Sequence, residues 1–144
     1  MNKSDPTQIF NLLYTPYKSL LDSIRKSKNL VIPQDIHDAH LIILFAIDRE
    51  FGSNQKKLAD KLFISKQSIG VSIDYLIGKK YLNKIKDPVD ARANLIKLSD
   101  KGWSIIEACR MELKEIMESL KEKIGLKNYK KLFTLLKLFN SAFD

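Results

Sequence analysis

The sequence predicts a mostly α-helical fold that contains one small β-hairpin. Five glycines and four prolines occur in 144 residues, and long stretches carry apolar residues three and four positions apart, as the buried face of a helix does. One polar octad, Asp87–Asn94, separates two short segments in which charged and apolar residues alternate. A pattern of two short helices joined by a tight turn, at 54–80, precedes it. Two such helices followed by a basic hairpin are the layout of a winged helix-turn-helix domain.

The bulk composition is that of one globular domain. Hydrophobic residues make up 44% and charged residues 29%, and the mean hydropathy is -0.21. The longest apolar run, at 41–47, is too short to span a bilayer, and the N-terminus lacks the apolar segment of a signal peptide. The single cysteine excludes an intramolecular disulfide. We therefore expect a cytoplasmic protein with no membrane partner.

Positive charge is concentrated in the middle of the chain. The formal net charge is +8; residues 54–101 carry eleven basic and five acidic side chains, whereas residues 1–53 carry six of each. Lysines that served solubility alone would be spread along the chain. A concentrated positive field is expected of a protein that binds a polyanion, so the charge favours a nucleic-acid partner.

The first two helices are predicted from their apolar spacing. Residues 6–27 carry one apolar stripe, and Pro16 should bend or break that helix locally. Residues 34–49 are apolar nearly all round in their second half, so we expect them to form the central buried helix. Gly52 suits the left-handed cap that closes this helix, and Ser53 can cap the next one.

The helix-turn-helix is predicted at 54–62 and 66–80, with Ser65 as the second N-cap. The second helix opens with short polar and amide groups, which can reach phosphates and base edges from a helix N-terminus placed in the major groove. Gln can pair with adenine, and Ser hydroxyls and free backbone amides can hold phosphate. The DNA-contacting residues predicted here are Ser65, Lys66, Gln67, Ser68, Val71 and Ser72. The alternative is a merely well-capped surface helix.

The hairpin strands are predicted at 84–86 and 95–98, each with one buried and one wet face. The octad between them cannot continue a strand, because proline lacks the amide donor and Asp and Asn favour turns. Ser99 can cap the helix that follows, which starts near Asp100.

The hairpin also carries candidate DNA contacts. Lys84, Lys86 and Lys97 suit phosphate neutralisation, and Arg92 near the tip suits a narrow minor groove, where the negative potential is enhanced. Asp90 lies two residues before Arg92 and could orient its guanidinium through a bidentate pair. The alternative is an ordinary surface salt bridge that contributes little to stability.

The terminal segments carry more apolar surface than a small central domain can cover. The helices predicted at 100–125 and 128–143 bear such stripes, as does the first helix. Closed two-fold dimers are the commonest soluble oligomers, so we expect a homodimer; the alternative is a larger monomeric helical core. The predicted organisation is one chain with a DNA-binding lobe at 30–100 and dimerisation helices at 1–29 and 101–144.

Several motifs within residues 54–102 share one pattern: Leu58-Ala59, Ser65, Asp87-Pro88-Val89-Asp90-Ala91-Arg92-Ala93 and Leu98-Ser99-Asp100-Lys101-Gly102. They resemble the MarR (multiple antibiotic resistance regulator) family, whose wing is similar to D-P-x-D-x-R followed by L-S/T-x-K-G. The resemblance implies a homodimeric winged-helix regulator whose recognition helix starts at Ser65 and whose wing arginine is Arg92. It also implies a small-molecule effector or another signal that alters the spacing of the two lobes. Tyr81-Leu82 and Tyr75-Leu76-Ile77 depart from the Gly-Leu and Arg-Leu-Glu that the family often has there.

Candidate sensing residues are few. Cys109 could be a redox switch, as in peroxide-sensing relatives, but their reactive cysteine lies near the N-terminus, which favours a buried, unreactive thiol. His37 and His40 could share a metal with Asp35 or Asp38; without a defined third ligand, ordinary polar positions are the favoured interpretation. The sequence contains no catalytic motif, so we expect no enzyme activity and no cofactor.

The sequence thus predicts a homodimeric, sequence-specific regulator of transcription that binds a pseudo-palindromic site on double-stranded DNA. Each recognition helix would enter a major groove and each wing an adjacent minor groove. The rival is a winged-helix protein-interaction module whose basic surface is incidental; a steep salt dependence of binding separates the two. A third interpretation is a metal- or redox-sensing version of the first.

Overall fold

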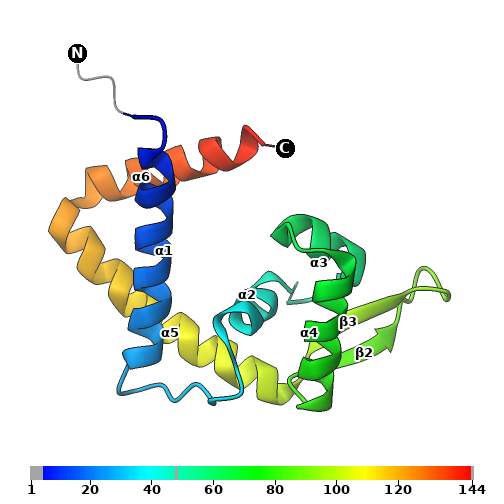
Figure 1. Ribbon diagram of the computed structural model, residues 1–144. Coiled ribbons are helices and arrows are strands. Elements are labelled where there is room, and N and C mark those ends of the chain that lie inside the picture. The colour runs from blue at the N-terminus through cyan, green and yellow to red at the C-terminus, as the bar shows by residue number, and fades with distance from the viewer. Residues whose placement is uncertain (1–4, 48, 144) are drawn as a thin grey trace.

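The computed structural model describes residues 5–47 and 49–143, which form two regions joined by a long helix (Figure 1). The second, third and fourth helices and the sheet make one lobe; the first and last helices extend outside it, and the fifth runs from one region to the other. In chain order the elements are α1 (Gln8–Lys26), α2 (Asp38–Ala46), β1 (Ser53–Asn54), α3 (Gln55–Leu62), α4 (Lys66–Gly78), β2 (Leu82–Lys86), β3 (Asn94–Leu98), α5 (Asp100–Ile124) and α6 (Leu126–Ser141).

The first two helices differ in detail from the sequence prediction. α1 continues through Pro16 as one helix, so the proline does not break it. α2 is nine residues long and does not fill the predicted range 34–49. It begins four residues after the predicted start, at Asp38, because His37 is its N-cap. The His37 amide donates to Nδ1 of His40 at 3.2 Å.

The helix-turn-helix is present as predicted, with one cap exchanged. Asn54 caps α3, because its side chain accepts two backbone amides of the first turn, whereas Ser53 lies in β1. Ser65 caps α4, and the Ser68 amide donates to its Oγ at 3.1 Å. Between the two helices Phe63 has a φ of 54°, a left-handed conformation that closes the turn.

The sheet has three antiparallel strands in the order β1-β3-β2, one more than the predicted hairpin. β2 and β3 pair with Lys84 opposite Ile96, and β1 adds Ser53 opposite Ile96 on the other edge. Only β3 shows the predicted burial on one face: Ile96 is buried, whereas Ile85 of β2 is 37% exposed.

Gly52 makes the pairing of β1 with β3 feasible. Its φ is 76°, as expected for the left-handed region, but it lies beyond α2 and does not cap that helix. A Cβ at this position would lie 2.8 Å from Cγ of Lys97 and 2.9 Å from the carbonyl oxygen of Ile96. A side chain here would push β1 away from β3.

The junction between the wing and α5 is equally close. The Gly102 amide donates to Oγ of Ser99 at 3.1 Å, which confirms Ser99 as the cap of α5, and the Ser99 hydroxyl donates to the Lys80 carbonyl at 2.6 Å. A Cβ on Gly102 would lie 2.2 Å from the carbonyl oxygen of Tyr81. The start of α5 is therefore packed directly against the chain that leaves α4.

The hydrophobic core lies in the lobe and at its junctions with α1 and α5. Its fully buried large side chains are Ile24, Ile36, Leu41, Ile43, Leu44, Leu58, Ile69, Ile73, Leu76, Tyr81, Leu82 and Ile96. α6, all of which is described, contributes no buried residue. Among the described helices none is long and apolar enough to cross a membrane.

Candidate nucleic-acid interface

The first turn of α4 is exposed and fixed by its own hydroxyls. The Ser65 hydroxyl donates to Oγ of Ser68 at 2.9 Å and accepts the Ser68 amide, so both side chains hold the turn. Lys66 and Gln67 are exposed beside them. The first amides of a helix lack partners within the helix, so this turn can bind an anion such as a phosphate.

The outward face of α4 continues beyond its first turn. Val71 is 68% exposed, whereas Ile69, Ile73 and Leu76 are buried on the opposite side. Ser72, predicted to contact DNA, is half-buried and lies toward the packed side of the helix. Asp74 is exposed and shares the outward face with Gln67 and Val71, a position that the sequence analysis missed. Its spacing of seven residues from Gln67 and three from Val71 was the available signal.

The far end of α4 is anchored to the segment before α2. The Tyr75 hydroxyl donates to the Asp35 carbonyl at 3.0 Å, and the Tyr81 hydroxyl donates to Oδ1 of Asp35 at 3.3 Å. The Lys79 ammonium lies 3.8 Å from Oδ2 of the same residue. Burial and the charge of Asp35 raise the pKa of Tyr81, so its hydroxyl remains a donor at neutral pH. These contacts set the orientation of α4 in the lobe.

The tip of the wing is ordered by hydrogen bonds to aspartate side chains. Oδ1 of Asp87 accepts the Val89 amide at 2.8 Å, and Oδ1 of Asp90 accepts the Arg92 amide at 2.9 Å. The Ala93 amide donates to the Asp90 carbonyl at 2.9 Å. The predicted pair between the Asp90 carboxylate and the Arg92 guanidinium is not found among the described residues. An aspartate in a turn captures the backbone two residues on, and that local bond takes its place.

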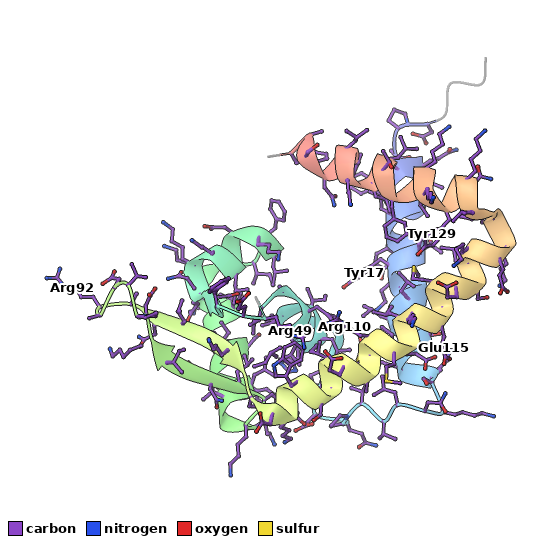
Figure 2. All side chains as sticks on the ribbon, turned by 180° about the vertical axis from the view of Figure 1, so that it is seen from behind. Tyr17, Arg49, Arg92, Arg110, Glu115 and Tyr129 are labelled. Carbon is purple, nitrogen blue, oxygen red and sulfur yellow. The ribbon has the colours of Figure 1, made fainter. Side chains whose placement is uncertain are left out.

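The cations of the wing differ in their surroundings. Arg92 projects from the tip, away from the rest of the chain (Figure 2), and Lys84 and Lys86 on β2 are exposed. Lys97 on β3 donates to the carbonyl oxygen of Glu50 at 3.0 Å, so it is tied to the lobe. The structure thus places three of the four predicted cations where a polyanion can reach them.

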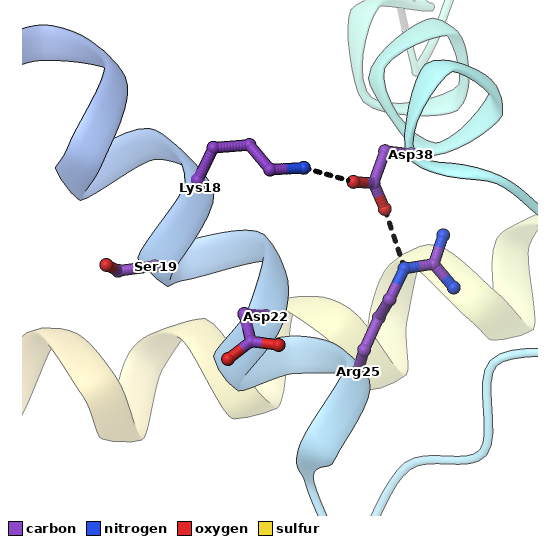
Figure 3. A pocket seen from close by; sticks show the side chains of 5 residues that line it. All are labelled: Lys18, Ser19, Asp22, Arg25 and Asp38. Carbon is purple, nitrogen blue, oxygen red and sulfur yellow. Dashed lines mark hydrogen bonds and ion pairs between the residues drawn. The ribbon is translucent and has the colours of Figure 1, made fainter.

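A cluster of ion pairs connects α1 to the start of α2 (Figure 3). Lys18 Nζ lies 2.7 Å from Oδ2 of Asp38, and Arg25 Nε lies 2.6 Å from its Oδ1. Arg25 also donates from Nη2 to the Ile36 carbonyl at 2.8 Å. Hydrogen bonds from Lys18 and Arg25 lower the pKa of the Asp38 carboxyl. These side chains line an open pocket of about 390 Å³ together with Ser19 and Asp22.

The surroundings of Cys109, His37 and His40 bear on their candidate sensing roles. Cys109 is fully buried, and burial raises the pKa of its thiol to about 11, so the reactive thiolate is scarce at neutral pH. His40 stacks on Tyr75 at 4.9 Å between ring centroids. The described residues contain no group of three metal-ligating side chains, so the metal site considered for His37 and His40 lacks a third ligand there.

Comparisons with known proteins give a consistent picture. Residues 34–93 match the model of the MarR family. The uncharacterized HTH-type transcriptional regulator YhbI of Bacillus subtilis (strain 168) is 23% identical over 116 residues, which cover 80% of this chain and 75% of that relative.

Among solved structures, a mutant MepR from a multidrug resistant S. aureus clinical isolate has a TM-score of 0.73 at 16% identity, with 99% of both chains covered. Wild-type MarR from E. coli, in its apo form, has a TM-score of 0.69 at 20% identity, with 96% of this chain and 98% of that chain covered. The PcaV transcriptional regulator from Streptomyces coelicolor, in complex with its natural ligand, has a TM-score of 0.70 at 16% identity, with 98% and 95% covered. At these identities the solved structures are similar to this chain in fold.

Proposed function

Residues 34–93 match the model of the MarR family, and we propose that the chain is a transcription regulator of that family which acts as a homodimer on a pseudo-palindromic site in duplex DNA. Members of the family regulate transcription and are not enzymes. In the proposed complex α4 of each protomer enters a major groove and each wing reaches the adjacent minor groove. Two-fold symmetry then separates the half-sites by about one helical turn of DNA.

The observation that carries this proposal is the exposed first turn of α4 on the same lobe as a wing with accessible cations. Lys84, Lys86 and Arg92 would neutralise phosphates or enter the minor groove, and the α4 turn would hold a phosphate and present Gln67 to a base. Asp90 would act indirectly by shaping the turn that presents Arg92. The proposed DNA-contacting set is Ser65, Lys66, Gln67, Ser68, Val71, Ser72, Lys84, Lys86 and Arg92, with Asp90 in support.

The dimer is proposed because α1 and α6 leave large apolar side chains exposed. Phe10 is 74% exposed, Leu12 67% and Leu138 61%. Large apolar side chains exposed in this number call for a partner, and a second copy of the chain would cover both helices in one symmetric contact. We therefore assign residues 30–100 to the DNA-binding lobe and residues 1–29 and 101–144 to dimerisation.

The response to an effector is proposed to act through the ion pairs of Asp38. A small molecule with a carboxylate would compete with Asp38 for Lys18 and Arg25 in the open pocket beside them. Loss of these pairs would release α2, and with it the lobe, from α1. The two lobes of a dimer would then change their spacing and fit the two half-sites less well.

The proposed function is tested by selecting bound fragments from random duplex DNA with the purified protein. We expect a two-fold symmetric consensus, and an affinity that falls steeply as the salt concentration rises. A consensus with no symmetry would contradict the dimeric mode of binding. No enrichment together with weak, salt-insensitive binding would instead favour the rival function, a protein-interaction module.

A further inference from the structure

We propose that Asp74 is a specificity-determining residue that accepts a hydrogen bond from the N4 amino group of a cytosine in the DNA site. This inference rests on the proposed function, because it needs α4 in the major groove. It adds an acidic base-reading position to an interface that is otherwise basic.

The placement of Asp74 on α4 is the first support. Gln67, Val71 and Asp74 are all exposed, and at 3.6 residues per turn they fall within an arc of about 60°. Ile69, Ile73 and Leu76 are buried on the opposite side and fix which face is turned outward. From Gln67 to Asp74 the helix rises about 10 Å, which corresponds to about three base pairs. The three side chains can therefore address neighbouring base pairs of one half-site.

The second support is that Asp74 has no partner among the described residues. Among the described residues, no hydrogen bond or ion pair involves its carboxylate, although many cations lie in the lobe. Lys79, the basic residue nearest to it in sequence, pairs with Asp35 on another segment. The carboxylate is therefore free to accept a hydrogen bond from a ligand and contributes nothing visible to the fold.

The charge of Asp74 is unfavourable on random DNA. From Gln67 to Gly78 it is the only charged residue of α4, and no cation shares its face of the helix. A carboxylate that faces phosphates and base acceptors lowers the affinity for every site that offers it no donor. The major-groove edge of cytosine offers such a donor, its N4 amino group, whereas the edge of guanine presents the acceptors N7 and O6. Asp74 should thus favour cytosine and reject guanine at one position.

The neighbouring side chains complete the expected half-site. Gln67 suits adenine, whose N6 and N7 match a side-chain amide, and the exposed isopropyl group of Val71 suits the methyl group of thymine. No arginine or lysine lies on this face to bind guanine. The half-site that α4 contacts should therefore contain A·T pairs next to one cytosine, which Asp74 contacts.

The test repeats the DNA selection with Asp74→Asn, Asp74→Ala and the control Glu115→Gln. Glu115 is exposed on α5, far from the wing and α4, and its substitution removes the same unit of charge (Figure 2). Asparagine pairs with adenine through its amide. We expect Asp74→Asn to change one preferred base per half-site from cytosine to adenine, and Asp74→Ala to bring the four bases at that position within about 3-fold of one another. The wild-type protein should disfavour guanine there by about 10-fold or more.

Two results would overturn the proposal. If both Asp74 variants keep the wild-type consensus and bind all DNA more tightly, with a steeper salt dependence, Asp74 only repels phosphates. If the wild-type protein selects no sequence at all, the proposed function itself fails, which is a different outcome from an unchanged consensus. Thermal unfolding should be the same for wild type and variants, since the Asp74 carboxylate contacts no other described group.

Discussion

The lobe and the terminal helices use apolar residues in opposite ways. In the lobe, α2, α3, α4 and the sheet bury their large aliphatic side chains against one another, as with Leu41, Leu58 and Leu76. In α6 no side chain is buried, although Phe133, Leu138 and Phe139 lie along it and the whole helix is described. The lobe completes its hydrophobic core within one chain, whereas the terminal helices leave large apolar side chains exposed.

This difference assigns separate sources of stability to the two regions. Burial inside the lobe stabilises the folded chain at any protein concentration. Burial of the α1 and α6 faces, if a second copy covers them, contributes only when the protein is concentrated enough to associate. Measurements at several protein concentrations can therefore test the comparison directly.

The largest effect is expected from a cavity in the lobe. Leu76→Ala removes a fully buried side chain from the inner face of α4 and should lower the free energy of unfolding by about 2–5 kcal/mol. The loss should be the same in dilute and concentrated samples, as measured by denaturant unfolding. A loss that disappears on concentrating the protein would mean that the lobe also depends on a partner.

The same substitution in α6 should behave differently. Leu138 is 61% exposed, so Leu138→Ala leaves the core of the single chain intact. If both copies of Leu138 are buried in a dimer, the change should weaken association by about 1–3 kcal/mol per side chain, and sedimentation at graded concentrations would measure this. Lys137→Ala, at the adjacent exposed position, is the matched control and should leave the dimer unchanged. Equal effects of the two substitutions would argue against an α6 interface.

Arg92 tests function apart from the stability of either region. It projects from the wing tip and packs against neither the lobe nor the terminal helices, so Arg92→Ala should leave unfolding and dimerisation unchanged. Affinity for the selected site should fall by about 1–3 kcal/mol, measured by titration of labelled duplex. Lys should replace it poorly, because an ammonium is more strongly hydrated than a guanidinium in a narrow groove. Unchanged affinity would remove the wing from the account of DNA binding.

Local patterns could be predicted from the sequence, and long-range contacts could not. The Ser65 and Ser99 caps and the Asp-Pro turn depend on a few neighbouring residues, and all three are present. β1 is two residues long and exists because of a partner strand some forty residues away, with Gly52 making room for it. No local pattern predicts such a strand, so the sequence alone assigns Gly52 to a helix cap.

The same distinction applies to the candidate interface. The sequence predicts Gln67, Val71 and Ser72 on the outward side of α4 and does not single out Asp74. In the structure Asp74 is exposed and Ser72 is half-buried, so Asp74 joins the outward face and the role of Ser72 stays a prediction. At the wing, Asp90 was matched to the side chain of Arg92, whereas its carboxylate bonds the nearer backbone amide. Residue chemistry identifies the candidate surface, and the structure shows which of its side chains are exposed and what they bond.

The smallest effect concerns pH at the start of α2, where His40 packs against α4. His40 lies at the N-terminus of α2, and its Nδ1 accepts the His37 amide, which requires an unprotonated nitrogen. Burial and the nearby His37 lower the pKa of His40, while a backbone hydrogen bond and the charge of Asp35 oppose that shift. Tyr75 of α4 is stacked on the ring, and Asp38 is paired with Lys18 and Arg25.

The sign of the pH effect follows from this lowered pKa. Because the folded state disfavours the protonated ring, His40 contributes stability that is present above its ordinary pKa of 6.5 and is lost as the pH falls below that value through the folded pKa. A cation at a helix N-terminus opposes the helix dipole, which acts in the same direction. Denaturant unfolding between pH 7.5 and 5 should show a modest loss in the wild-type protein, smaller than that caused by Leu76→Ala. His40→Gln, whose amide oxygen can still accept the His37 amide, should be flatter over that range. A wild-type stability that rises toward pH 5, with a flat His40→Gln, would show that Asp35 controls the ring instead and would place a favourable charge at the contact between α2 and α4.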